Sequence, residues 1–182
     1  SDGFASDMIW FRHADPNFPF LWEGSDQPAA RWHADREGPA HYFADTSDGA
    51  WAEFVRHEEI KDPDDLAGVQ RAIWAVEVPD EPAESVALPE ATLLGGHTSY
   101  AACQTEAKRL RDAEGVRRIV VPSAALLPGG AAGHLVNGGL HPAPPRDGTV
   151  TVLFGLRPDL VGWAAVHEGR PRADLLAKVR HF

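Results

Sequence analysis

The sequence predicts an α+β domain built around a largely antiparallel β-sheet. Short strand-like runs and short helix-like segments follow one another without regular alternation, which is typical of this fold class. The chain shows no internal repeat and no linker long enough to divide it, so we expect a single domain over residues 1–182. A chain of this length buries roughly 70% of the surface that its unfolded form exposes, so its core needs neither a disulfide nor a structural metal.

Two strands joined by a long loop are predicted in the N-terminal part of the chain. The apolar and aromatic run Met8–Arg12 predicts the first strand. Residues 13–38 are rich in Pro, Asp and Gly without a hydrophobic period, and loops of this length in compact domains are often functional. The second strand is expected at His41–Ala44. Thr46 and the polar residues after it then offer N-cap chemistry for a helix that begins near Ala50.

That helix has a clear hydrophobic face. Trp51, Phe54, Val55 and Glu58 fall on one side of it. Glu53 lies about 200° around the axis from Trp51, at about 100° per residue, so it is off the expected core face. The packing of the hydrophobic helix face therefore does not account for the glutamate at position 53.

Two more helices and four more strands are predicted farther along. Pro63 opens a short helix over 63–72, because proline suits the first turn of a helix. A longer helix is expected over Thr98–Glu114, with Thr98 or Ser99 as its N-cap. The expected strands are Ile73–Val78, Arg117–Val121, Thr149–Phe154 and Leu160–Val166.

Composition excludes several classes of protein. The net charge of −10 argues against direct nucleic-acid binding, which relies on clustered Lys and Arg. Residues 1–7 do not resemble an export signal, and proline and glycine interrupt the weakly charged stretch 119–140, so we expect no membrane span. The single cysteine, Cys103, excludes an internal disulfide and fits a reducing compartment. We therefore expect a cytoplasmic protein.

Charge is unevenly distributed along the chain. Acidic residues concentrate between residues 35 and 90, and a basic cluster follows at 108–118. An acidic protein that docks on a basic partner shows this pattern, and so does an ordinary acidic protein.

Two candidate binding residues lie in or just after the long loop. Arg31 has the side chain best suited to hold a diphosphate, because the planar guanidinium bonds two oxygens at once. The alternative is a surface arginine stacked on Trp32. Tyr42 offers an aromatic face for a flat ligand ring, or packs its ring in the core with its hydroxyl at the edge.

Glu53 and Ser123 are the candidates for chemistry. Glu53 points away from the hydrophobic helix face, and its alternative role is a surface pair with Arg56 or His57. Ser123 directly follows a predicted strand, where sites often form, although Pro-Ser is also ordinary turn chemistry. No Gly-x-Ser-x-Gly surrounds this serine, so a nucleophile elbow is not supported.

Neither metal-site nor dinucleotide-binding motifs are complete. The run that begins at His57 lacks the second histidine of His-Glu-x-x-His, so we expect no metal. The glycine-rich stretch 129–133 does not match Gly-x-Gly-x-x-Gly, so a Rossmann site is not expected.

Taken together, the candidate segments resemble the RES domain, a family named for its arginine, glutamate and serine. The resemblance covers about residues 10–142, and residues 149–182 look like a C-terminal extension with strands and a tail. The segments that carry it are Arg31-Trp32-His33, Gly38, Tyr42-Phe43-Ala44-Asp45-Thr46, Ala50-Trp51-Ala52-Glu53, Val121-Pro122-Ser123, Leu135-Val136-Asn137 and His141-Pro142.

This resemblance implies a fold, an activity and a partner. RES proteins are similar in fold to ADP-ribosyltransferase toxins, with a split sheet that cradles NAD⁺. Many are bacterial toxins of toxin–antitoxin pairs, and their antitoxins often carry a helix-turn-helix DNA-binding domain. They consume NAD⁺ by cleaving the bond between nicotinamide and ribose.

Roles for individual residues follow from the same resemblance. Arg31, Tyr42, Glu53 and Ser123 match the family's catalytic positions, and Asn137 matches its asparagine-containing segment. A carboxylate beside the ribose favours an oxocarbenium-like transition state, which is the role implied for Glu53. Tyr42 would stack on nicotinamide, and Ser123 would bond near it or fix Glu53.

Arg12 resembles the early basic residue that holds the NAD⁺ ribose or phosphate in related transferases. With Arg31 it would hold the diphosphate and so orient the reacting bond.

The sequence leaves the fate of ADP-ribose open. Water, phosphate or a protein acceptor can attack the same intermediate, so a mono-ADP-ribosyltransferase is an alternative to an NAD⁺-degrading enzyme. A non-catalytic acidic module that binds a basic protein is a second alternative.

Overall fold

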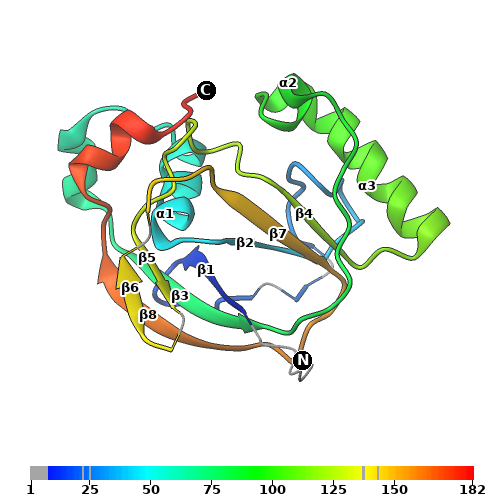
Figure 1. Ribbon diagram of the computed structural model, residues 1–182, viewed down its shortest axis with the longest axis horizontal. Coiled ribbons are helices and arrows are strands. Elements are labelled where there is room, and N and C mark those ends of the chain that lie inside the picture. The colour runs from blue at the N-terminus through cyan, green and yellow to red at the C-terminus, as the bar shows by residue number, and fades with distance from the viewer. Residues whose placement is uncertain (1–7, 22, 25, 137, 143) are drawn as a thin grey trace.

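A six-stranded antiparallel sheet forms the centre of the computed structural model, which describes residues 8–21, 23–24, 26–136, 138–142 and 144–182 (Figure 1). Its strand order is β4-β7-β2-β1-β3-β8. A separate hairpin is formed by β5 and β6. The strands are β1 (Met8–Ala14), β2 (Ala40–Ala44), β3 (Arg71–Val78), β4 (Arg118–Pro122), β5 (His134–Val136), β6 (Leu140–Pro142), β7 (Thr149–Phe154) and β8 (Val161–Gly169).

The sheet is split between β1 and β2. These two strands share one register pair, Phe11 with Ala44. By contrast, β1 pairs with β3 at every residue from Met8 to Ala14, and β2 pairs with β7 along its whole length. The sheet therefore consists of two three-stranded halves that meet at one narrow point, and the expected α+β fold with a split antiparallel sheet is confirmed.

Short helices pack around the two halves. Helix α1 contacts β1, β2 and β3 and so spans the split, whereas the apolar face of α3 packs on β4 and β7 (Figure 1). The helices are α1 (Ser47–His57), α2 (Glu90–Leu93), α3 (Tyr100–Glu114) and the 3₁₀ helices η1 (Pro63–Gly68), η2 (His97–Ser99) and η3 (Ala173–Lys178).

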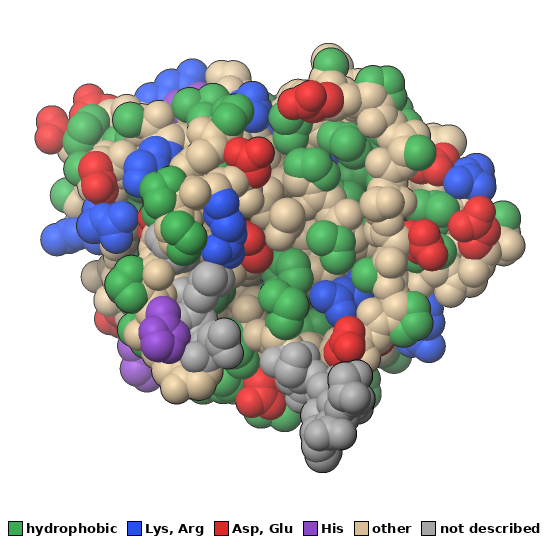
Figure 2. All heavy atoms as spheres, in the orientation of Figure 1, with side chains coloured by type: hydrophobic (Ala, Val, Ile, Leu, Met, Phe, Trp, Pro, Cys, Tyr) green, Lys and Arg blue, Asp and Glu red, His purple; other side chains and the backbone are tan. Residues whose placement is uncertain are grey.

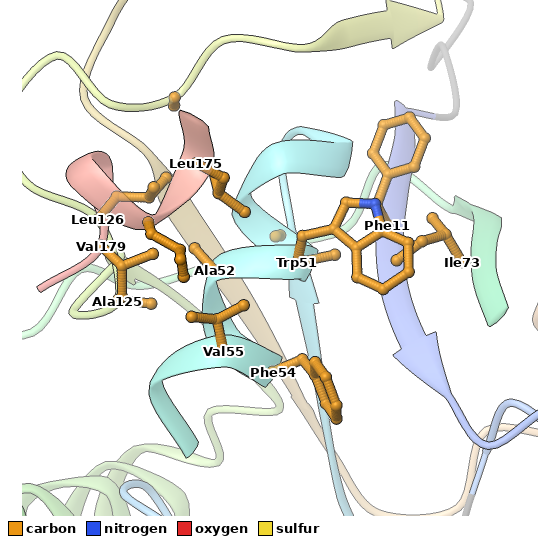
Figure 3. Close-up of a cluster of buried hydrophobic side chains, with 14 of the residues drawn as sticks. Phe11, Trp51, Ala52, Phe54, Val55, Ile73, Ala125, Leu126, Leu175 and Val179 are labelled. Carbon is orange, nitrogen blue, oxygen red and sulfur yellow. The ribbon is translucent and has the colours of Figure 1, made fainter. Parts of the chain in front are cut away.

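Local sequence explains where α1 begins and how it sits. The Thr46 hydroxyl accepts a hydrogen bond from the Gly49 amide at 3.0 Å, as expected of an N-cap. Trp51 points toward Phe11 and Ile73 on the sheet (Figure 3). Other apolar side chains of α1 face the C-terminal segment and the residues after β4, which they contact through Ala125, Leu126, Leu175 and Val179 (Figure 3).

Successive side chains of the central strands point to opposite faces of the sheet. In β1, Phe11 joins the cluster around α1, while Trp10 joins a cluster on the other face with Phe43 and Leu153. A third cluster lies between α3 and the β4–β7–β2 half. Both faces are thus covered close to the split.

Two of the predicted helices were misjudged in part. The helix expected over 63–72 is a 3₁₀ helix that ends at Gly68, because pairing with β1 and β8 draws Arg71 and Ala72 into β3. Ser99 does not cap α3 through its side chain; its hydroxyl donates to the Gly96 carbonyl instead.

Other boundaries shifted by a few residues, and some elements had no prediction. Strand β1 continues to Ala14, so Arg12 lies inside it rather than at its end. Helix α2, the β5–β6 hairpin and η3 were not expected, because each is short and has no clear hydrophobic period of its own.

No helix in the described ranges is long and apolar enough to cross a membrane. On the face shown in Figure 2, basic, acidic and hydrophobic side chains are intermingled over the described atoms rather than separated into large areas of one charge.

Replacement of Trp51 by alanine should strongly destabilise the protein, because this side chain is 7% exposed and joins α1 to the sheet. We expect the free energy of unfolding to fall by about 3–5 kcal/mol in denaturant titrations. Trp163→Ala is the matched control, since Trp163 lies on the edge strand β8 and is 43% exposed. Equal losses in the two variants would contradict the packing described here.

Candidate active site

A cavity of about 530 Å³ opens where the two halves of the sheet separate. Its wall includes Arg12 from β1, Arg31 from the long loop, Tyr42 from β2 and Glu53 from α1. Ser123 follows β4 and reaches the site through Glu53. The fold thus brings together five residues singled out from the sequence, while Asn137 lies outside the described residues.

The Glu53 carboxylate receives little hydrogen bonding from the described residues. The Ser123 hydroxyl donates to its Oε1 at 3.4 Å, which is long for a hydrogen bond between oxygens. Burial raises the pKa of Glu53, whereas the positive charges of Arg56 and Arg31 and the bond from Ser123 oppose this rise. The alternative role for Glu53, a surface pair with Arg56 or His57, is not among the ion pairs of the described residues.

Arg31 is buried and bonded to a facing segment, so it is not a surface arginine. Its Nη1 donates to the Thr92 carbonyl at 3.2 Å and to the Ser99 hydroxyl at 3.0 Å, and its Nη2 donates to the Gly95 carbonyl. The guanidinium lies over the ring of Tyr100, 4.6 Å from its centroid, rather than against Trp32. Arg31 therefore connects the long loop to residues 92–100.

Tyr42 has a hydroxyl that is fully used within the protein. It accepts a hydrogen bond from the Trp32 amide at 3.0 Å and contacts His33 Nδ1 at 2.8 Å. His33 Nε2 lies 2.9 Å from the Pro28 carbonyl, so this network assigns the proton to Nε2 and makes Tyr42 the donor to Nδ1.

The same network leaves the tyrosine ring available to a ligand. Burial raises the pKa of Tyr42 and lowers that of His33, so both stay neutral around pH 7. Tyr42 thus offers its ring to the cavity, not a proton.

Arg12 is the candidate with unused donors. Its Nη1 is buried and has no hydrogen-bond partner among the described residues. Burial lowers the pKa of Arg12 to about 10, which still leaves the side chain charged at neutral pH. An unpartnered cationic donor in a cavity wall is well suited to a phosphate oxygen of a ligand.

Several residues of the wall had no prediction from the sequence. The sequence suggests Arg56 only as a surface partner of Glu53, yet Arg56 is 5% exposed and lines the cavity. His97, Tyr100 and Phe182 also line it. They come from segments far from Glu53 in the chain, and no local pattern marks them.

The long loop is held in place by side-chain amides. Gln27 bonds both the amide and the carbonyl of Ala40, each at 2.7 Å. A Cβ at Gly38 would lie 2.8 Å from the Gln27 Oε1, so a larger residue there would displace the Gln27 side chain. From α3, Gln104 donates to the Ala30 carbonyl at 2.8 Å. These bonds fix the loop on both sides of Arg31.

No metal-ligand cluster of three or more His, Cys, Asp or Glu side chains occurs in the part of the chain that the structure describes. The cavity wall instead carries the guanidinium groups of three arginines, one carboxylate and four histidines.

Replacement of Glu53 by glutamine should stabilise the fold at neutral pH by about 1 kcal/mol. The folded protein holds the Glu53 proton more tightly than the unfolded chain, whose glutamate ionises near 4.5. The contribution of this group to stability is therefore lost as pH rises above 4.5 toward its raised folded value. Denaturant titrations across this range should show a growing advantage of Glu53→Gln, whereas the exposed Glu58→Gln should not. A constant difference would contradict a raised pKa.

Comparison with known proteins agrees with this architecture. Among solved structures, a chain of the M. tuberculosis MbcT–MbcA toxin–antitoxin complex matches with a TM-score of 0.57 and 14% identity, over 95% of this chain and 88% of that chain. Identity this low is evidence for a shared fold alone. No curated protein matches the sequence. The family model of the RES domain matches residues 8–157, which includes β7 as well as the motifs, so the chain belongs to the RES domain family.

Proposed function

We propose that this protein is the toxin of a toxin–antitoxin pair and that it cleaves the nicotinamide–ribose bond of NAD⁺. The observation that carries the proposal is Glu53, a carboxylate in the wall of a cavity of about 530 Å³, with guanidinium groups nearby and its oxygens largely free. A cavity of this volume lies within the usual range for small-molecule sites. Membership of the RES domain family supports the same activity.

The proposed reaction breaks one bond and forms one. The bond between ribose C1′ and the nicotinamide nitrogen breaks, and its electron pair leaves with nicotinamide. The ribose then develops oxocarbenium character, which the negative charge of Glu53 stabilises. When water is the acceptor, its oxygen bonds to C1′ and its proton is released, which gives ADP-ribose, nicotinamide and H⁺.

We expect the arginines and the tyrosine to bind the other parts of NAD⁺. Arg12 lies in the cavity wall and carries a positive charge with a buried, unpartnered Nη1, so it would attract a phosphate of the ligand. Arg31 uses both terminal nitrogens on protein acceptors, so a diphosphate bound there would share or replace those acceptors. Tyr42, with its hydroxyl occupied, would stack its ring on nicotinamide.

A protein partner follows from the toxin assignment. An uncontrolled NAD⁺-consuming enzyme would exhaust a substrate that the cell needs, so a cognate antitoxin would cover the cavity until it is removed. The fold match to a chain of a toxin–antitoxin complex supports this arrangement. We infer that the antitoxin is encoded beside the toxin and carries a helix-turn-helix DNA-binding domain.

Purified protein should release nicotinamide from NAD⁺, and Glu53→Gln should slow the release about 10²–10³-fold, the usual cost of one lost transition-state contact. Glu58→Gln is the matched control on the same helix and should retain full activity, because Glu58 is exposed. The measurement is nicotinamide formation by chromatography, with thermal unfolding as the check of folding. Undiminished cleavage by folded Glu53→Gln would reject the assignment.

The acceptor of ADP-ribose is decided by a second experiment. Labelled NAD⁺ incubated with the enzyme and a cell lysate should yield label in small molecules, with phosphate and phosphate-free buffers separating phosphorolysis from hydrolysis. A discrete labelled protein band would instead identify a mono-ADP-ribosyltransferase. Absence of both turnover and a thermal shift with NAD⁺ would favour a non-catalytic acidic binding module.

A further inference from the structure

We propose that Arg56 is a positioning residue: one helical turn after Glu53, it supplies the positive potential that keeps the Glu53 carboxylate ionised without occupying its oxygens. The inference rests on the proposed function insofar as it concerns catalysis. The effect of Arg56 on the ionisation of Glu53 can be measured without enzymatic turnover.

The position of Arg56 is unusual for an arginine near the end of a helix. Residues three apart lie on the same side of a helix, so Arg56 follows Glu53 along the cavity wall. Its side chain is 5% exposed, whereas His57, the next residue, is exposed. A guanidinium that merely favoured the helix C-terminus would not need burial.

All contacts of the Arg56 guanidinium are with uncharged groups. Nη1 donates to the Ala124 carbonyl, and Nη2 donates to the Gly95 carbonyl at 3.0 Å. The group lies over the ring of Phe182, 4.3 Å from its centroid. Its Nε is buried without a hydrogen-bond partner in the described part of the chain. No carboxylate of the described residues therefore forms an ion pair with this guanidinium.

The charge acts instead on a carboxylate that it does not touch. Among the groups that oppose the burial of the Glu53 carboxylate, Arg56 has the largest effect and Arg31 the next. The effect is mutual, because Glu53 in turn helps to keep Arg56 charged. Electrostatic attraction acts beyond hydrogen-bond distance, so Arg56 can favour the ionised carboxylate without itself bonding either oxygen.

Other charged and titratable groups around Glu53 do not replace Arg56. Arg31 is bonded across the cavity to residues 92–99 and belongs to the proposed substrate contacts, so its substitution would alter binding as well. The groups that act on Glu53 or line the same cavity are Arg12 and His13 of β1, Arg31 and His33 of the long loop, Tyr42 of β2, Arg56 and His57 of α1, His97 of η2, Tyr100 of α3, and Ser123 after β4.

The arrangement also anchors the segments on both sides of Glu53. Ala124, whose carbonyl Arg56 binds, is adjacent to Ser123, which donates to Glu53. The Gly95 carbonyl accepts from both Arg56 and Arg31. A purely structural role for Arg56 would follow from these bonds alone, so the test must separate charge from anchoring.

The pH dependence of NAD⁺ cleavage separates them. Arg56→Gln removes the charge, and Arg56→Lys keeps it but loses the planar fork. We expect the acid limb of kcat/KM, where Glu53 loses its proton, to move up by about one pH unit in Arg56→Gln and to stay near its original position in Arg56→Lys. Arg109→Gln is the control, since it makes the same change in net charge at an exposed site on α3.

A second measurement does not depend on catalysis. The carboxyl carbon of Glu53, assigned in ¹³C NMR by its absence in Glu53→Gln, should titrate at higher pH in Arg56→Gln than in the original protein. If the original protein does not cleave NAD⁺, the proposed function fails while this titration still decides the role of Arg56.

Three outcomes would overturn the inference. The first is an unchanged titration of Glu53 in folded Arg56→Gln. The second is equal loss of kcat in both Arg56 variants with an unchanged acid limb, because that result describes anchoring alone. If Arg56→Gln does not fold, a limb that moves up by a full unit in Arg56→Lys is the third, since this variant retains the charge.

Discussion

The narrow junction between β1 and β2 is the constraint on which the rest of this structure depends. If the two central strands paired along their full length, backbone hydrogen bonds would join them throughout. The sheet would then have no opening at its middle. Here the strands meet at Phe11 and Ala44, and each half of the sheet is completed by its own outer strands. Helix α1 contacts β1, β2 and β3 and so spans the junction, and Glu53 on this helix lines the opening.

The chemistry of the site depends on charges that are close but not in contact. Ion pairs with direct bonds would satisfy Glu53 and block it. Instead, the guanidinium groups of Arg31 and Arg56 donate to backbone carbonyls. The Gly95 carbonyl accepts a hydrogen bond from each of them. The Glu53 carboxylate therefore lies in the cavity wall close to positive charges, with only the long bond from Ser123 to one of its oxygens. Arg12, with an unpartnered donor, completes a cavity suited to an anionic ligand.

Much of the architecture could be predicted from local patterns. The hydrophobic face of α1 and the Thr46 cap appear as expected, and so do the main strands. Errors occurred where tertiary pairing overrode local preference, as at 63–72, where strand formation with β1 and β8 ended a predicted helix early. Short elements such as α2 and the β5–β6 hairpin were missed, because three or four residues carry no usable period.

For the site, the order and spacing of Arg31, Tyr42, Glu53 and Ser123 indicate the family, and the match of the family model confirms that prediction. Sequence by itself therefore determined the family, the fold class and the candidate chemical groups, since these depend on residue type and spacing. Tertiary structure alone decided that Arg31 is bonded to carbonyls, that the Tyr42 hydroxyl is occupied by His33 and Trp32, and that Arg56 is buried beside Glu53. Burial, hydrogen-bond partners and the electrostatic environment of a charge arise from residues distant in the chain, and no local pattern encodes them.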